Sequence, residues 1–183
     1  MKAGTFLTIM MLISSLCVWA ADPMLASSIK WQGATGSLEG DTWKAKHVFM
    51  LQRPGVPKPT DRDEALMEIA HGEPIQKAIA AWIRDHPKAV VVPIVDYKAS
   101  KASDRTATFV WVVDGVHILN IELVRQGFLT PFSQSQYFTE QQKLEVSRAD
   151  YDAFVQQAAK AGQEAQEAKA GVWRIPGNFK KKR

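Results

Sequence analysis

Hydrophobic and polar residues follow strand and helix periods along most of the chain, and the clearest pattern lies near its centre. Residues 106–113 are rich in β-branched and aromatic side chains, which suit a pleated, half-buried strand. Asp114 and Gly115 follow directly, and this pair is typical of a type I′ turn, whose two central residues both need a positive φ. The pattern therefore predicts a strand that turns back on itself in a tight hairpin.

A helix is predicted immediately after this hairpin. Asn120 can cap it by accepting a hydrogen bond from an amide of the first turn. Leu123 and Val124 then form its apolar face, and Gly127 suits the left-handed backbone that ends many helices. Arg105 stands just before the strand, beside a polar loop, which makes it a candidate functional residue.

Earlier in the chain, the pattern predicts strands at residues 29–38, 43–46 and 47–51. Residues 53–60 contain three prolines and a glycine, so they cannot continue the interior of a sheet. Residues 89–95 form a short, continuous apolar run. We expect this run to be a strand with its Pro93 at an edge or a bulge.

Three further helices are predicted. The first covers residues 61–70 and has an acidic first turn, and the second covers residues 73–84 and includes Trp82 on its apolar face. The third is a long helix over residues 140–170, capped by Thr139 and followed by Gly171. Its inward stripe comprises Leu144, Tyr151, Phe154, Val155, Ala158, Ala161 and Ala165.

The order of these elements predicts an α+β fold, because the strands come in hairpin-like groups and do not alternate singly with helices. A five-stranded, partly open barrel of the OB-fold type, closed by helices, fits the number of strands. Barrels of this type often bind oligonucleotides or oligosaccharides on one face. We find no repeat and no internal domain boundary.

The N-terminus resembles a secretory signal. Lys2 precedes an apolar stretch at residues 6–18, and Ala20 ends a small-residue cleavage site, so residues 1–20 are interpreted as a signal peptide. The stretch is short for a membrane span, although an uncleaved anchor is the alternative. Cys17 is the only cysteine, and a mature chain without it would depend on its core alone. We therefore expect an exported protein, in the periplasm or the medium, without stable membrane insertion.

The rest of the chain is long enough for one domain with a sizeable core. We assign residues 21–28 to a flexible lead-in, 29–175 to the domain and 176–183 to a basic tail. The formal net charge of +4 is mildly basic, so it permits a polyanionic partner without requiring one.

Several short motifs resemble one known family. Arg105 and Thr106 open the central strand, Asp114 and Gly115 end it, and Asn120 is followed by LVRQG at residues 123–127. An EGDT turn at residues 39–42 and a KAGVW segment at residues 169–173 flank them. Together these motifs resemble the staphylococcal-nuclease-like, or thermonuclease, domain. The resemblance covers roughly residues 29–174, which is nearly all of the chain after the predicted signal peptide.

The resemblance implies a five-stranded OB barrel with three helices that hydrolyses DNA and RNA phosphodiesters with one Ca²⁺. The site of that family uses two metal-binding carboxylates, a glutamate that acts on water, and two arginines on the phosphate. Asp41 matches the first metal carboxylate, and Arg105 matches the downstream arginine. Calcium prefers hard oxygen ligands, and a guanidinium can hold two phosphate oxygens at once.

The third predicted strand departs from the family pattern. In one register, Phe49, Pro54 and Pro57 stand where the family has its first arginine, its second metal carboxylate and its catalytic glutamate. A shift by one residue puts Met50, Gly55 and Lys58 at these positions. Neither register recovers an arginine or an acid, so the resemblance implies an eroded site.

Three functions are compatible with these residues. The first is binding of single-stranded DNA or RNA, or of another polyanion, by a monomer without a cofactor. Its expected contacts are basic and aromatic residues: Lys44, Lys46, Tyr97, Lys98 and Lys101. The second is a working Ca²⁺-dependent nuclease with substitute acids at Asp61, Asp63 and Glu64. The third is a protein-interaction module of the cell envelope.

The four histidines do not suggest a metal site. They are His47, His71, His86 and His117, and they are scattered along the sequence without the spacing of metal ligands. We therefore expect them to be structural.

Overall fold

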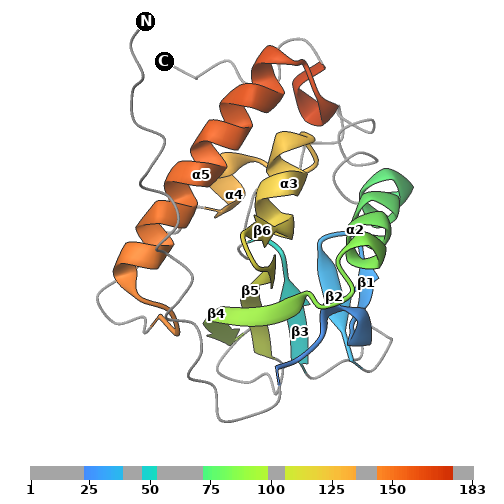
Figure 1. Ribbon diagram of the computed structural model, residues 1–183, viewed down its shortest axis with the longest axis vertical. Coiled ribbons are helices and arrows are strands. Elements are labelled where there is room, and N and C mark those ends of the chain that lie inside the picture. Colours follow the sequence, from blue (N-terminus) through green and yellow to red (C-terminus); the bar gives the residue numbers. More distant parts are fainter. Residues whose placement is uncertain (1–22, 39–46, 53–71, 99–105, 135–143, 175–183) are drawn as a thin grey trace, which may run out of the picture.

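The computed structural model describes residues 23–38, 47–52, 72–98, 106–134 and 144–174 (Figure 1). The predicted signal peptide, the predicted strand at residues 43–46, the proline-rich segment at 53–60 and the predicted helix at 61–70 lie outside these ranges. The described part contains one mixed sheet with helices packed on it, so the α+β prediction is confirmed.

The strands are β1 (Lys30–Gln32), β2 (Thr35–Ser37), β3 (His47–Met50), β4 (Val90–Lys98), β5 (Thr106–Asp114) and β6 (His117–Ile118). They are ordered β1-β2-β3-β5-β4, and β6 pairs with β5. The pairing of β3 with β5 is parallel, and the other pairings are antiparallel.

The described strands do not form a closed barrel. One isolated antiparallel bridge joins Leu25, which precedes β1, to Val90 at the start of β4. Two backbone hydrogen bonds support this bridge, from Ala26 N to Ala89 O at 2.8 Å and from Val91 N to Met24 O at 2.8 Å. Among the described residues, the segment that leads into β1 is thus the connection between the two edges of the sheet.

β5 is the central strand, because it pairs with β3, β4 and β6. Its residues from Thr108 to Val113 are all buried, as expected of a strand covered on both faces. On β4, the register shifts between Pro93 and Val95, which confirms the predicted bulge.

The hairpin after β5 is confirmed, but its turn type is not. Asp114 pairs with His117, so Gly115 and Val116 are the two central residues. Gly115 has a φ of 58°, whereas Val116 has no positive φ. This is the pattern of a type II′ turn, which needs a positive φ only at its first central residue.

The α-helices are α2 (Glu73–Asp85), α3 (Leu119–Arg125), α4 (Pro131–Gln134) and α5 (Arg148–Glu167), and two 3₁₀ helices are η1 (Ala26–Ser28) and η3 (Gly171–Arg174). Figure 1 shows α3 and α4 beside the long α5, with α2 on the other side of α3, and residue contacts agree with this arrangement. The α5 ring of Phe154 stacks on Trp111 of β5, with ring centroids 4.3 Å apart.

Three sequence predictions need correction. Residues 29–38 form two strands and not one, because Gly33 has a φ of 57° and turns the chain between β1 and β2. α5 begins at Arg148, where the Ser147 side chain accepts a hydrogen bond from Asp150 N, and the described residues 144–147 before it are not helical, whereas the predicted Thr139 cap and residues 140–143 lie outside the described residues. α4 lies between α3 and α5, where the sequence pattern predicted no helix.

Of the predicted stripe on α5, five residues are buried: Tyr151, Phe154, Ala158, Ala161 and Ala165. Val155 is half-buried, and Leu144 precedes the helix.

Asn120 does not cap α3. The N-cap residue is Ile118, and Asn120 lies inside the helix with none of its surface exposed. Its Oδ1 accepts a hydrogen bond from Val112 N at 3.1 Å, and its Nδ2 donates to Val110 O at 3.0 Å and Leu51 O at 2.9 Å. The prediction of a cap was wrong because the side chain satisfies buried backbone groups of β5 and of the chain after β3.

A buried glutamine completes this network. Gln134 of α4 donates through Nε2 to Leu51 O at 3.1 Å, and its Oε1 lies 3.4 Å from Asn120 Nδ2. Tyr151 of α5 donates its hydroxyl hydrogen to Gln134 O at 3.1 Å. Two strands and three helices are thus joined through the amides of Asn120 and Gln134.

The two motifs that carried the resemblance at the C-terminal end of α3 and after α5 lie against each other. Val172 N donates to Gly127 O at 3.0 Å. Gly127 has a φ of 74°, which confirms its role at the end of α3, and Gly171 has a φ of 48°. A Cβ on Gly127 would lie 2.4 Å from Ala170 O, so this backbone approach requires glycine.

Replacement of Asn120 by alanine should destabilise the protein by about 3 kcal/mol, because the change removes the side-chain partner of the buried Val112 N and Val110 O and leaves Leu51 O with Gln134 alone. The measurement is the free energy of unfolding in urea. The control is Gln126→Ala, which removes an exposed hydrogen bond to Glu122 and should cost less than about 0.5 kcal/mol. Equal stability of the two variants would contradict the role assigned to Asn120.

Gly162 on α5 provides a second prediction. An alanine normally stabilises a helix interior by about 1 kcal/mol relative to glycine. A Cβ at this position, however, would lie 2.0 Å from Pro131 Cγ of α4. Gly162→Ala should therefore destabilise the protein by about 1 to 3 kcal/mol. In Pro131→Ala, which lacks that atom, the same change should cost clearly less, and an unchanged cost would contradict a clash with Pro131.

Candidate functional site

Three strands, β3, β4 and β5, have one end each at the same end of the sheet. His47 opens β3 and pairs with Thr106, which opens β5, and Thr106 also pairs with Lys98, the last residue of β4. This convergence follows from the parallel β3–β5 and antiparallel β4–β5 pairings. We call this end of the sheet, with its residues His47, Asp96, Lys98, Thr106 and Thr108, the basal end.

Of the predicted site residues, the structure describes Tyr97 and the backbone of Lys98. Tyr97 lies on β4, is half-buried and packs against the core, and the backbone of Lys98 ends that strand. Five others lie outside the described residues: Asp41, Lys44, Lys46, Lys101 and Arg105. In the sequence, Lys46 directly precedes His47, and Arg105 directly precedes Thr106. The proposed substitute acids Asp61, Asp63 and Glu64 also lie outside the described residues.

A hydrogen-bonded chain crosses the basal end from one strand to the next. The Thr108 hydroxyl on β5 donates to Asp96 Oδ1 on β4 at 2.5 Å. His47 Nε2 on β3 lies 2.6 Å from the same hydroxyl oxygen. Thr108 is 2% exposed, whereas His47 and Asp96 are exposed on either side of it.

The hydrogen bonds among His47, Thr108 and Asp96 define the tautomer of His47. The Thr108 hydroxyl has one hydrogen, which it gives to Asp96, so its oxygen must accept the hydrogen bond from His47. Nε2 therefore carries a hydrogen in both the neutral and the charged ring. The Nδ1 atom has no hydrogen-bond partner among the described residues.

The described residues at the basal end do not suffice for a Ca²⁺ site. Calcium takes six to eight oxygen ligands. Asp96 offers one carboxylate, which already accepts the Thr108 hydrogen, and the described part of the chain holds no group of three or more His, Cys, Asp or Glu side chains that could bind a metal. Asp41 lies outside the described residues, so its predicted role as a ligand is not tested.

A second polar cluster lies at the opposite end of β5. His86 ends α2, and its Nδ1 lies 3.0 Å from Asp114 Oδ2. Its ring stacks on Trp82 with centroids 4.1 Å apart and lies 5.1 Å from the ring of His117. Two histidines that are far apart in sequence, His86 and His117, are therefore neighbours in the fold.

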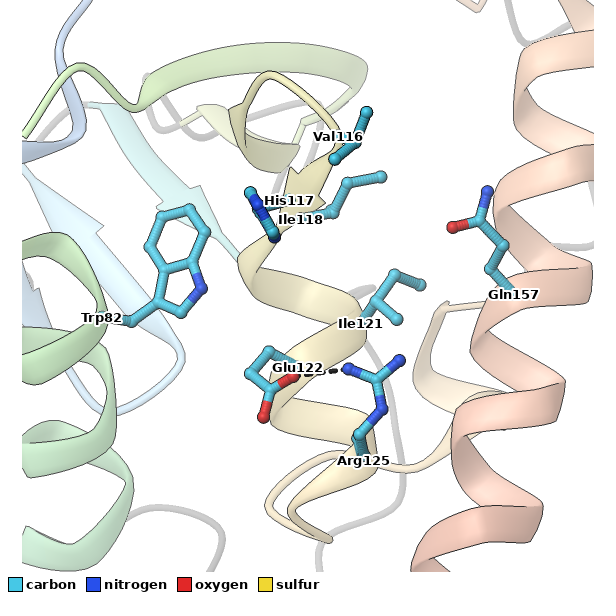
Figure 2. A pocket seen from close by; sticks show the side chains of 8 residues that line it. All are labelled: Trp82, Val116, His117, Ile118, Ile121, Glu122, Arg125 and Gln157. Atoms are coloured by element: carbon cyan, nitrogen blue, oxygen red, sulfur yellow. Dashed lines mark hydrogen bonds and ion pairs between the residues drawn. The ribbon is translucent and has the colours of Figure 1, made fainter. Parts of the chain in front are cut away.

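A shallow pocket of about 150 Å³ opens beside this cluster (Figure 2). It is lined by Trp82, Val116, His117, Ile118, Ile121, Glu122, Arg125 and Gln157. Trp82 was predicted to be a core residue. It does pack against the core, but it is half-buried and forms one wall of the pocket.

The cation of this pocket already has anionic partners. Arg125 donates to Glu122 Oε2 at 2.5 Å and to Glu164 Oε2 at 3.0 Å. Burial acts to lower the pKa of Arg125, but the hydrogen bonds that it donates to Glu164 and Glu122, with the attraction of these two charges, outweigh burial and raise that pKa. The two carboxylates offset the positive charge, which makes this pocket a poor site for a phosphate.

The sequence did not identify His47, Thr108 and Asp96 as a group. They lie on three strands, and their contact depends on the parallel pairing of β3 with β5. Alternation along residues 106–113 could have placed Thr108 on the same face as Thr106. No local pattern could have placed His47 beside it, because strand register between distant segments is set by tertiary packing.

In comparisons with known proteins, no family model and no curated protein matches this chain. Among the helices of the described residues, none is both long and apolar enough to span a membrane.

Proposed function

We propose that this chain is an exported, thermonuclease-like protein that binds single-stranded nucleic acid or another polyanion through the basal end, and that its phosphodiesterase site is eroded. The observation that supports the proposal most is the strand register. His47, Thr106 and Lys98 are paired neighbours, so the chain segments that carry the predicted basic contacts enter and leave the sheet at one end.

The topology supports the thermonuclease-like part of the proposal. A mixed sheet in the order β1-β2-β3-β5-β4, with a bridge from Leu25 back to β4, is compatible with a partly open OB barrel. The contact between Gly127 and Val172 also brings together two of the motifs on which the resemblance depends. Barrels of this kind bind single strands with basic grooves and aromatic platforms.

The two ends of β5 differ in their electrostatics, which favours the basal end for a polyanion. At the far end, Asp114 pairs with His86, and Glu122 and Glu164 pair with Arg125. Around the basal end the basic residues are known from the sequence alone: Lys46 directly precedes β3, Lys98 ends β4, Arg105 directly precedes β5, and Lys44 and Lys101 lie three residues from His47 and Lys98. A phosphate backbone gains affinity from such cations by releasing its counterions.

The residues favour binding over hydrolysis. Neither register of residues 48–58 supplies the arginine, the second metal carboxylate or the glutamate of the thermonuclease pattern. One phosphate-binding arginine without a base contributes little to the cleavage step. The alternative of an active Ca²⁺-dependent nuclease requires Asp61, Asp63 or Glu64 to replace these acids, and the same experiment tests it.

The predicted binding is strong at low salt and weakens steeply as salt rises. The chain from residue 21 onward would be titrated with fluorescent oligothymidylate and oligouridylate at several salt concentrations. In the double variant Lys98→Ala/Lys101→Ala, the slope of log affinity against log salt should become shallower by about 1.4, since each phosphate contact to a single strand contributes about 0.7.

The matched control removes the same charge elsewhere. Lys88 is exposed beside the opposite end of β4, and Lys160 is exposed on α5, so Lys88→Ala/Lys160→Ala should leave the slope nearly unchanged. Equal slopes for the two double variants would show that the basal end is not the interface. No binding at low salt would instead favour an envelope interaction module.

A parallel incubation with Ca²⁺, and then with a chelator, tests the erosion of the site. We expect no metal-dependent cleavage of DNA or RNA. Cleavage that requires Ca²⁺ and is lost in Arg105→Ala would contradict erosion and establish the nuclease alternative.

A further inference from the structure

We propose that the His47 imidazole is a phosphate-binding group of the basal end, which binds a phosphodiester of a single-stranded nucleic acid when the ring is protonated. The inference rests on the proposed function, and it adds a residue that the sequence suggested was structural. It depends on the contact of His47 with Thr108 and Asp96, all three of which are described residues.

Two contacts fix the orientation of this exposed ring. The Nε2 atom donates to the Thr108 hydroxyl at 2.6 Å, and the ring stacks on Phe49 with centroids 4.9 Å apart and planes inclined by 26°. Phe49 is 5% exposed and Thr108 is 2% exposed, so both supports belong to the core. An exposed side chain held on two sides has already lost much of its rotamer freedom, which lowers the entropic cost of binding an anion.

The tautomer makes phosphate binding depend on protonation. Nε2 holds its hydrogen because the Thr108 oxygen can only accept. In the neutral ring, Nδ1 therefore carries a lone pair and no hydrogen, so it repels a phosphate oxygen. Protonation adds a hydrogen at Nδ1 and a positive charge, so that this nitrogen becomes a charge-assisted donor while Nε2 remains bound to Thr108.

Among the described side chains around the His47 ring, Asp96 provides the one charged group. β5 contributes the uncharged Thr106 and Thr108, β4 contributes the carboxylate of Asp96 behind the Thr108 hydroxyl, and the β2 residues that pair with β3 are the uncharged Thr35 and Gly36. His86 differs, because the carboxylate of Asp114 already pairs with its Nδ1. Of these two histidines, His47 is the one whose Nδ1 has no hydrogen-bond partner among the described residues.

The test is the affinity for a short oligothymidylate at about pH 5.5 and about pH 7.5 at one salt concentration, because histidine changes its charge between these values. The unmodified chain should bind about five- to tenfold more tightly at the lower pH, as expected of one added charge-assisted contact. His47→Gln should lose most of this ratio. His117→Gln, which changes an exposed histidine at the opposite end of β5, should keep it.

The variant Thr108→Val tests whether the pH effect needs the hydrogen bond that holds the His47 ring, or only the presence of a histidine. It removes the hydroxyl and keeps the shape, so the pH ratio should fall although His47 remains. Thr108→Ser should retain the ratio, because it restores the hydroxyl.

Nitrogen NMR of the histidine rings gives a readout that does not depend on affinity. In the free protein at about pH 7.5, the neutral His47 ring should carry its hydrogen on Nε2, and oligothymidylate at the lower pH should shift its Nδ1 resonance. A neutral His47 ring protonated on Nδ1, or a pH ratio unchanged in His47→Gln, would overturn the inference while the proposed function stands. No binding at either pH would overturn both.

Discussion

The side-chain amide of Asn120 is the interaction on which the rest of the structure depends. It is fully buried, and it satisfies Val112 N, Val110 O and Leu51 O with one acceptor and one amino group. These three atoms belong to β5 and to the chain just after β3. Because an unpaired backbone group in the core costs about 1 to 3 kcal/mol, the helix that carries Asn120 is bound to one position over the sheet. Gln134 and Tyr151 then extend the same network to α4 and α5, so the position of all three helices follows from it.

The candidate site depends on this network through strand register. β3 has only four residues, and a short strand by itself specifies its register weakly. The bonds from Asn120 and Gln134 to Leu51 O, and that from Leu51 N to Ala34 O at 2.8 Å, hold the chain where β3 ends. With this end fixed, Phe49 pairs with Thr108 and His47 with Thr106, which brings the imidazole to the Thr108 hydroxyl. A shift of β3 by one residue would turn His47 to the other face of the sheet.

The sequence could predict what is decided locally. Gly127 ends α3, Pro74 fits the first turn of α2, and Pro93 lies at the irregularity of β4, because each of these residues restricts or widens its own backbone choices. Asn120 was misassigned because an asparagine near the start of a helix satisfies a local cap rule equally well, and only the fold shows the buried groups that need it. The chain of His47, Thr108 and Asp96 was missed for the same reason. Its members are 61 and 12 residues apart in sequence, and tertiary packing alone makes them neighbours.

Different residues of β5 therefore support the fold and the basal end. This separation explains how residues at the basal end can change while the fold is kept. The backbone of Val110 and Val112 binds Asn120, whereas the side chain of Thr108, two residues earlier, meets the solvent-facing groups of the basal end. Substitutions at the exposed His47 and Asp96 leave the Asn120 bonds untouched, because those bonds use main-chain atoms of other residues. The Asn120 network and the hydrogen bonds of the basal end thus depend on different parts of the strand. Under the proposed function, this separation lets residues of the basal end change while the sheet register is kept.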